Sequence, residues 1–148
     1  MEKKKYTEKR REYWDYIAAQ NTRGLVRGKG YHGRLQQVYN FCVPHGMKIL
    51  ELGCGCGDLL SSLRPSKGVG VDFSEKMLDQ AKERHPELEL RQADAHEFFV
   101  DEKYDIIIMS DLVNDIEDVQ RLMMNIKKCC HPGTRIIINY YSHLWEGL

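Results

Sequence analysis

The stretch MKILELGCGCGDLL, residues 47–60, decides how this chain folds. A short apolar run ends around Glu51 and is followed by three alternate glycines, Gly53, Gly55 and Gly57. Because glycine has no Cβ, it accepts positive φ angles and lets a ligand approach the backbone closely. A strand, a glycine-rich turn and a helix in this order are typical of a site for a nucleotide-like ligand.

The spacing of the glycines indicates which class of ligand the loop binds. The dinucleotide fingerprint is G-x-G-x-x-G, and its last glycine admits close packing of helix and strand above a pyrophosphate. Here the pattern is G-x-G-x-G, and Asp58 stands where that last glycine would fall. An acid at a helix start suits the helix dipole but repels a pyrophosphate. The loop therefore predicts a nucleoside without phosphates, and an NAD-binding Rossmann domain is the less favoured alternative.

The length of the chain predicts one compact domain, and its composition says little about function. The chain has 148 residues with 22 Lys plus Arg and 22 Asp plus Glu, so charge gives no argument for nucleic acid. The basic residues within 2–11 are diluted by glutamates and indicate a solvated helix face. No bilayer-length apolar run or signal peptide appears, so we expect a cytoplasmic protein without a membrane span. The five cysteines lack a C-x-x-C pair, which favours reduced thiols over a metal or redox site.

Strands and helices are expected to alternate after residue 46. Continuous apolar runs such as IIIM and IIIN are typical of strands covered on both faces, which favours a doubly wound, mainly parallel α/β sheet of order 3-2-1-4-5. We expect residues 1–46 to form amino-terminal helices, with a glycine-rich linker or lid at 21–33, and residues 47–148 to form the ligand-binding domain. Strands are expected at 48–53, 68–73, 88–93, 104–110 and 134–141. Helices are expected at 2–20, 35–43, 58–63, 74–84 and 116–130.

Acidic or polar residues follow successive strands, where ligands of such sheets bind. Asp72 ends the second strand and can accept hydrogen bonds from two ribose hydroxyls. Asp94 follows the third strand and can accept from an adenine amine, while the Ala95 amide donates to a ring nitrogen. Ser110 opens a polar turn after the fourth strand. Each aspartate alone is more often a turn residue, but together with the glycine loop they indicate an adenosyl group.

These motifs resemble those of class I S-adenosylmethionine-dependent methyltransferases over residues 48–141. ILELGCGCG is similar to their first motif, VGVDFSEKML to their second-strand motif and QADA to their adenine-binding motif. The resemblance implies S-adenosylmethionine as cofactor, S-adenosylhomocysteine as product and methyl transfer as activity. It implies that the glycine loop meets the methionine part, Asp72 the ribose, Met77 the adenine face, and that Glu51 supports the loop and the ammonium. The implied cofactor-binding residues are Glu51, Gly53, Cys54, Gly55, Gly57, Asp72, Phe73, Met77, Asp94, Ala95 and Ser110.

A closer likeness concerns DLVNDIEDVQ, NYYSHLWEGL and GYHGRLQQVYNFCVPHG, which resemble methyltransferase modules fused to bacterial glycosyltransferases. By analogy it implies a glycan or lipid-linked sugar as acceptor. Class I members usually carry two further strands, so we expect a fragment of a longer protein, or else a minimal five-stranded version. The fifth strand then becomes an apolar edge. We expect this edge, or the tail at 144–145, to pair with a second copy, or the amino-terminal helix to cover the edge.

The catalytic candidates lie in the lid and after the fourth strand. Positioning supplies much of the rate of methyl transfer, with effective molarities of ~10⁵ M or more, and a base helps when the acceptor is a hydroxyl. His32 is the candidate base, beside Tyr31 and with Asn114 or Asp111 across the crevice. A surface loop histidine is the alternative for His32. A module that binds S-adenosylmethionine without catalysis is the alternative for the whole chain.

Overall fold

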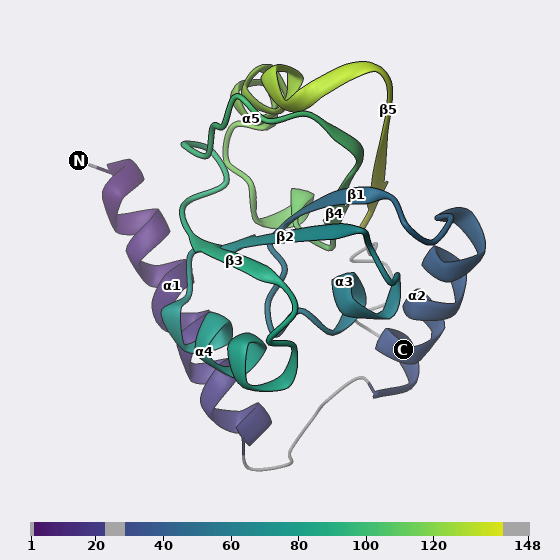
Figure 1. The fold of residues 1–148 in the computed structure, drawn as a ribbon. Coiled ribbons are helices and arrows are strands. Elements are labelled where there is room, and N and C mark those ends of the chain that lie inside the picture. Colours follow the sequence, from purple (N-terminus) through teal and green to yellow (C-terminus); the bar gives the residue numbers. More distant parts are fainter. Residues whose placement is uncertain (1, 23–28, 141–148) are drawn as a thin grey trace.

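A five-stranded parallel sheet with helices on both faces forms the centre of the molecule (Figure 1). The computed structural model describes residues 2–22 and 29–140, with side chains over 8–20 and 30–140. The strand order β3-β2-β1-β4-β5 confirms the predicted order and the doubly wound α/β class. The strands are β1 (Lys48–Leu52), β2 (Lys67–Asp72), β3 (Glu89–Gln92), β4 (Tyr104–Ser110) and β5 (Cys130–Asn139). The helices are α1 (Glu2–Thr22), α2 (Lys29–Cys42), α3 (Asp58–Ser62), α4 (Glu75–Arg84) and α5 (Val119–Ile126), with 3-10 turns η1 (Val113–Asp115) and η2 (Lys127–Cys129).

Alternate residues of the central strands enter two separate cores. Leu50 and Ile107 face the core on the side of α5, where Leu122 is fully buried. Ile49 and Ile108 face the other core, formed with α2 and α3. Burial on both faces explains why β1 and β4 are continuous apolar runs, since neither face meets water. The parallel pairing brings the carboxyl ends of all five strands to one edge of the sheet.

Local signals set most helix starts. Ser74 is the N-cap of α4, as predicted, and its hydroxyl accepts a hydrogen bond from the Met77 amide at 3.2 Å. The expected helix at 116–130 is wrong at its start, because Asp118 caps α5 and accepts from the Arg121 amide at 2.9 Å. Residues 116–118 form no helix and follow the turn η1, and residues 127–129 form the turn η2.

The expected lid is wrong for residues 29–33, which form the first turns of α2. Glycine lowers helix stability by about 1 kcal/mol but does not forbid a helix. The Tyr31 hydroxyl donates to both carboxylate oxygens of Asp111, at 2.9 and 3.0 Å, and this contact fastens the first turns of α2 to the sheet. Residues 23–28 of the expected lid lie outside the described residues.

The strand β5 also begins earlier than expected, at Cys130. Cys130 pairs with Tyr104, and the next pair joins Ile106 to Arg135, so the ladder is interrupted in between. The segment HPGT at 131–134 fills this interruption and is closed by a 2.8 Å bond from the His131 amide to the Thr134 hydroxyl. The expected end at residue 141 and the tail at 144–145 lie outside the described residues.

The helix α1 packs against α4, away from β5 (Figure 1). The expectation that the amino-terminal helix covers the β5 edge is therefore wrong for the described part of α1. Instead Trp14 Nε1 donates to Asp115 at 3.1 Å, and Arg10 also pairs with Asp115. These contacts hold α1 at the carboxyl edge of the sheet, beside the turn that follows β4.

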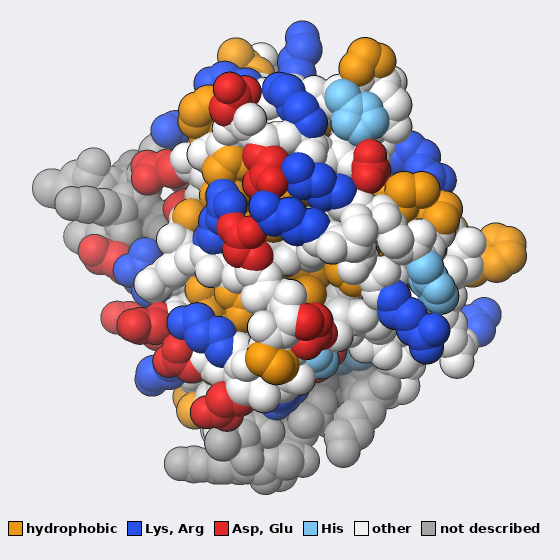
Figure 2. All heavy atoms as spheres, viewed as in Figure 1, with side chains coloured by type: hydrophobic (Ala, Val, Ile, Leu, Met, Phe, Trp, Pro, Cys, Tyr) orange, Lys and Arg blue, Asp and Glu red, His pale blue; other side chains and the backbone are white. Residues whose placement is uncertain are grey.

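The opposite, amino-terminal edge carries a network of ion pairs. Glu102 lies 2.7 Å from Lys67 Nζ and 2.9 Å from Lys48 Nζ, and it accepts from the Tyr104 hydroxyl at 2.8 Å. Figure 2 shows acidic and basic side chains interleaved over the face that it presents. Among residues 2–22 and 29–140, no helix has the length and apolar character needed to cross a membrane.

Candidate functional site at the carboxyl edge of the sheet

The loop between β1 and α3 turns three times through the left-handed region. Gly53, Gly55 and Gly57 have φ angles of 73°, 51° and 76°. The amide of Gly53 donates to the Val71 carbonyl at 2.8 Å, so the loop leaves β1 bound to β2. A Cβ at Gly55 would meet no atom within 4 Å, so the backbone there borders open space. The loop thus exposes a strip of backbone that a ligand can reach.

Asp72 links this loop to α4. Its Oδ2 accepts from the Gly55 amide and its Oδ1 from the Ser74 amide, both at 2.9 Å. The side chain is buried, and burial raises its pKa while these amides act in the opposite direction. Each carboxylate oxygen can accept a second hydrogen bond. Asp72 therefore supports the loop and still has acceptor capacity for a ligand.

Glu51 is a buried carboxyl group beneath the loop. It is only 2% exposed, and its Oε2 has no hydrogen-bond partner among the described residues. Burial, with the nearby Asp72 charge, raises its pKa well above the usual range, while a hydrogen bond from the Leu60 amide favours the ionised form. A buried acceptor without a partner is costly. A donor or a cation at this position would relieve that cost.

Cys54 anchors the loop to the sheet through its side chain. The thiol is buried, and a Cβ added to Gly70 of β2 would lie 2.8 Å from its Sγ. Glycine in β2 therefore makes room for Cys54 beneath the loop. Burial raises the pKa of the Cys54 thiol, so it is held as the neutral form. All five cysteines of the chain are free, and the described residues contain no group of three or more His, Cys, Asp or Glu side chains that could hold a metal ion.

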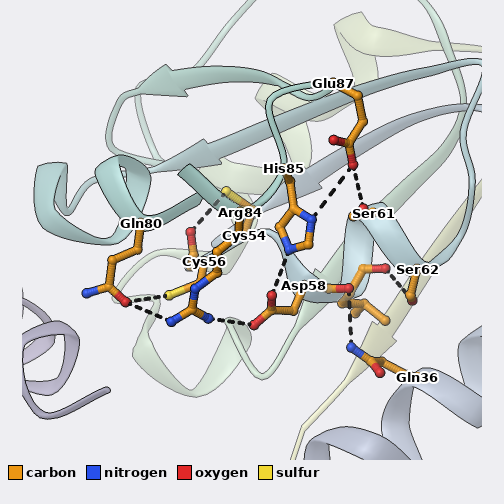
Figure 3. Close-up of polar contacts among 12 residues, drawn as sticks. Gln36, Cys54, Cys56, Asp58, Ser61, Ser62, Gln80, Arg84, His85 and Glu87 are labelled. Atoms are coloured by element: carbon orange, nitrogen blue, oxygen red, sulfur yellow. Dashed lines mark hydrogen bonds and ion pairs between the residues drawn. The ribbon is translucent and has the colours of Figure 1, made fainter. Parts of the chain in front are cut away.

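The Asp58 side chain points toward Arg84 and His85 at the end of α4 (Figure 3). Its carboxylate lies 3.2 Å from Arg84 and 2.7 Å from His85 Nε2. These partners offset its charge, so its repulsion of a phosphate is weaker than the sequence pattern alone suggests. The buried carboxyl groups of Glu51 and Asp72 are the stronger obstacle to an anion at this loop.

Side chains of α4 line the next part of the site. Met77 is buried, and the Cys56 Sγ lies 3.5 Å from its Sδ. Cys56 also lies 3.5 Å from the Gln80 side-chain oxygen, and Figure 3 shows Gln80 extending from α4 toward the loop. Phe73 is partly exposed between Asp72 and the cap residue Ser74. The loop and the start of α4 thus form one continuous surface.

Asp94 follows β3 and is held by His96. Its Oδ1 accepts from both the backbone amide and the Nδ1 of His96, each at 2.9 Å. The Asp118 amide donates to Nε2 of the same ring at 3.3 Å, which places the ring proton on Nδ1 in neutral His96. Within the described chain Oδ2 of Asp94 has no such partner, so this oxygen can accept from a ligand. Ala95 follows directly, in a turn.

A second polar cluster, which we call the Asp111 cluster, joins α2 to β4 and β5. It contains Tyr31, Tyr39, Asp111 and Asn139. Asp111 follows β4 with a φ of 54° and accepts from Tyr31 and, at 2.7 Å, from Asn139 Nδ2. The Tyr39 hydroxyl donates to Asn139 Oδ1 at 2.6 Å. Burial raises the Asp111 pKa, partly offset by the Tyr31 hydrogen bond and the nearby His32.

The structure brings some of the catalytic candidates together. Tyr31 contacts Asp111 directly, and the His32 ring packs edge-on against Tyr31 with centroids 5.6 Å apart. His32 lies in α2 rather than in a loop, so both the lid and the surface-loop interpretations are wrong for it. Asn114 lies in η1, and Ser110 ends β4 beside Tyr39.

Two polar residues of this edge were not expected from the sequence. Asn139 ends β5, where only an apolar edge strand was foreseen, and nothing in the sequence pairs it with Asp111. Asp15 of α1 accepts from the Ser74 hydroxyl at 2.5 Å, and its charge contributes to the raised pKa of Asp72. Its position could be found only by knowing that α1 reaches the start of α4.

The family comparison agrees with this geometry. A family model described as a methyltransferase domain matches residues 44–146, so the chain belongs to that family. Its sheet and helices form the Rossmann-like fold of class I methyltransferases, which confirms the family resemblance seen in the sequence. A phosphatidylethanolamine N-methyltransferase of Cereibacter sphaeroides is 34% identical over 106 residues, which cover 66% of this chain and 52% of the relative. The chain thus spans about half the length of that relative.

Solved structures show the same arrangement. An S-adenosylmethionine-dependent methyltransferase from Mesorhizobium loti aligns with a TM-score of 0.63 at 26% identity, covering 69% of this chain and 50% of that one. The DhpI-SAM-HEP complex aligns with a TM-score of 0.76 at 17% identity, covering 93% of this chain and 67% of that one. At that identity, the second likeness concerns the fold.

Proposed function

We propose that this chain binds S-adenosylmethionine at the carboxyl edge of the sheet and transfers its methyl group to a small-molecule acceptor. The observation that carries the proposal is the pairing of an open glycine loop with two buried carboxyl groups, Glu51 and Asp72. The relatives named for S-adenosylmethionine-dependent or N-methyl transfer support it.

The charges of the site fit this cofactor. S-adenosylmethionine carries a sulfonium and an ammonium beside one carboxylate, so it is a net cation that two buried carboxyl groups would stabilise. Glu51 offers its unpartnered Oε2 as an acceptor beneath the loop. NAD carries a diphosphate, which the same carboxyl groups would repel. The cofactor supplies an electrophilic methyl group, and the protein contributes mainly by holding and orienting the reactants.

The described residues suggest a division of roles. The backbone of 53–57 would hold the methionine part, and Asp72 would accept from the ribose hydroxyls through its spare lone pairs. Met77 would pack against adenine, with Phe73 beside it, and Asp94 Oδ2 with the Ala95 amide would read the adenine edge. Glu51 would receive the ammonium, directly or through water. Cys54 and Ser110 would shape the loop and the floor of the site.

The acceptor side would lie between α2 and the turn after β4, with His32, Tyr31 and Asn114 as the catalytic candidates. The likeness to modules fused to glycosyltransferases supports a glycan or lipid-linked sugar as one acceptor class. A second candidate function is a module that binds the cofactor without independent catalysis.

The first experiment is calorimetric titration of the chain with S-adenosylhomocysteine and with NAD. We expect S-adenosylhomocysteine to bind and NAD not to bind. Gly55→Ala should weaken S-adenosylhomocysteine at least tenfold, because the new methyl group enters the space left for the ligand. Gly46→Ala is the matched control. Gly46 has a φ of 77° and also has nothing within 4 Å, but it lies before β1, at the other edge of the sheet.

Three outcomes separate the candidates. Binding of NAD but not of S-adenosylhomocysteine would refute the proposal. Equal loss of affinity in Gly55→Ala and Gly46→Ala would show that backbone strain, not ligand contact, sets affinity. Binding of the cofactor without release of S-adenosylhomocysteine in the presence of an amine, alcohol and sugar acceptor panel would favour the binding-only module.

We also propose that two copies associate through β5. This strand is the edge of the sheet, and Ile136 and Ile138 are 38% and 42% exposed. An exposed apolar edge strand favours pairing with another chain. Light scattering should show a dimer, with slow amide exchange across 136–139. A monomer with rapid exchange there would contradict the proposal.

A further inference from the structure

Asp111 has a backbone conformation that is costly for residues other than glycine. Its φ of 54° lies in the left-handed region, which costs roughly 1–2 kcal/mol for most residues and less for Asp and Asn. Such strain persists where surrounding contacts fix the residue, and it is concentrated at functional sites. The Asp111 amide donates to the Asn139 carbonyl at 3.1 Å, so β5 holds this conformation in place.

Two side chains of the Asp111 cluster, Tyr31 and Asn139, donate hydrogen bonds to the Asp111 carboxylate. Because Asn139 Oδ1 accepts from Tyr39, its amide nitrogen must face Asp111 and donate to it. The Tyr31 hydroxyl has one proton and directs it at the same carboxylate. The cluster therefore suits Asp111 as an anion, and among the described residues Oδ2 accepts one hydrogen bond, which it shares with Oδ1, from Tyr31.

Among the described side chains, no lysine or arginine pairs directly with this anion. Within residues 8–20 and 30–140, no Lys or Arg forms an ion pair with Asp111, although His32 lies close enough to influence its charge. Partial burial raises the Asp111 pKa, so a further positive charge beside the carboxylate would favour its ionised form. The Tyr31 hydroxyl contacts it, the His32 ring packs edge-on against Tyr31, and aromatic faces attract organic cations.

Asp111 lies close to the glycine loop that is proposed to bind the cofactor. β1 lies between β2 and β4, so Asp72 and Asp111 follow the two strands that flank the loop. The next residue, Leu112, approaches the loop so closely that a Cβ on Gly53 would lie 2.9 Å from its Cδ1. Asp111 is therefore beside the loop, on the side opposite the proposed ribose contact.

We propose that Asp111 binds the ammonium group of a small-molecule amine, so that the methyl acceptor is a nitrogen. This inference rests on the proposed function. The ammonium supplies the missing positive charge, and an N–H proton passes to Asp111 Oδ2. The nitrogen keeps the electron pair of that N–H bond and becomes a neutral nucleophile. It would then form a bond to the methyl carbon as the carbon–sulfur bond of the cofactor breaks, with S-adenosylhomocysteine as the leaving group. A hydroxyl acceptor would leave the carboxylate charge uncompensated, so a neutral alcohol or sugar fits less well.

The test uses the full chain saturated with S-adenosylhomocysteine and two probes of matched shape, phenethylamine and 2-phenylethanol. Binding is followed by NMR shifts of the Asn139 side-chain amide. We expect the amine to bind at least tenfold more tightly than the alcohol. Asp111→Asn, which also tolerates the left-handed conformation, should remove this preference while S-adenosylhomocysteine affinity stays within about twofold. Asp101→Asn, an exposed carboxylate elsewhere, should keep the preference.

The possible failures are distinguishable. Equal responses to the two probes, or none to either, would overturn the role of Asp111, as would a preference that survives in Asp111→Asn. Loss of the preference in Asp101→Asn would overturn it too, because bulk charge would then be the cause. Failure to bind S-adenosylhomocysteine at all would instead overturn the proposed function on which the inference rests.

Discussion

Replacing Glu51 with glutamine should stabilise the ligand-free protein and lower its affinity for S-adenosylhomocysteine. Glu51 is buried, and burial with the Asp72 charge raises its pKa well above the value of 4.5 that the unfolded chain would have. For an acid whose pKa is raised by folding, stability is fully present below pH 4.5 and is lost as the pH rises through the folded-state pKa. Glutamine has nearly the same shape but never ionises, so Glu51→Gln should not suffer this loss.

The size of the effect follows from the linkage between protonation and folding. Each pH unit between the two pKa values lowers the stability of the wild type by about 1.4 kcal/mol. A loss of this size for each pH unit is a sizeable part of the roughly 5–15 kcal/mol of stability that is typical of a domain. Burial also raises the Asp72 pKa, and removal of the neighbouring Glu51 charge should make Asp72 easier to ionise.

The assay is urea denaturation of the wild type and of Glu51→Gln, without ligand, at half-unit steps from pH 4.5 to 8. The two stabilities should converge near pH 4.5, and the variant should become increasingly more stable above it. S-adenosylhomocysteine should bind the variant at least tenfold more weakly at pH 7.5, because the ammonium loses its carboxylate. A stability difference that does not change with pH, or a variant less stable at pH 8, would refute the reasoning.

Three further changes test other parts of the structure. Glu102→Gln should lower the free energy of unfolding by about 1 kcal/mol at pH 7. Hydrogen bonds from Lys67 and Lys48 lower the Glu102 pKa from 4.5 to about 2, so the stability that Glu102 contributes is lost as the pH falls from 4.5 to 2. Urea denaturation that gives the same difference between wild type and variant at pH 2 as at pH 7 would contradict this. Asp118→Ala should cost α5 about 1 kcal/mol through its lost cap, which thermal unfolding can measure; no shift in Tm would count against the cap. Gly70→Ala should displace Cys54 and make that thiol react with iodoacetamide, whereas an unreactive thiol would show that β2 adapts instead.

Much of the fold could be predicted because its signals are local. The apolar runs of β1 and β4 require burial on both faces, and Ser74 is a cap by residue type and position. The glycine spacing predicts the left-handed turns of the loop, and the structure places positive φ angles at Gly53, Gly55 and Gly57. In each case the residue itself specifies its conformation, so one sequence is sufficient.

The parts that could not be predicted depend on contacts between distant segments. The start of α2 contains two glycines, a pattern typical of a loop. Tyr31 in this segment contacts Asp111, which lies 80 residues further along the sequence, and no local pattern indicates that contact. Asn139 resembles an ordinary strand-end residue until β5 is placed beside β4. The position of α1 is set by polar contacts from Trp14 and Asp15, which no helical periodicity reveals.

The parallel sheet has one more consequence, which concerns the electric field of the molecule. Equal numbers of acidic and basic residues give a net charge of zero, but acidic side chains at the two edges of the sheet differ in their partners. The amino-terminal edge carries Lys48, Lys67 and Arg91 against Glu89 and Glu102. Acidic side chains follow the strands at the carboxyl edge: Asp72, Asp94 and Asp111. Among the described residues, these three aspartates form no ion pair with lysine or arginine, so cations should be drawn to this edge, and more rapidly at low ionic strength.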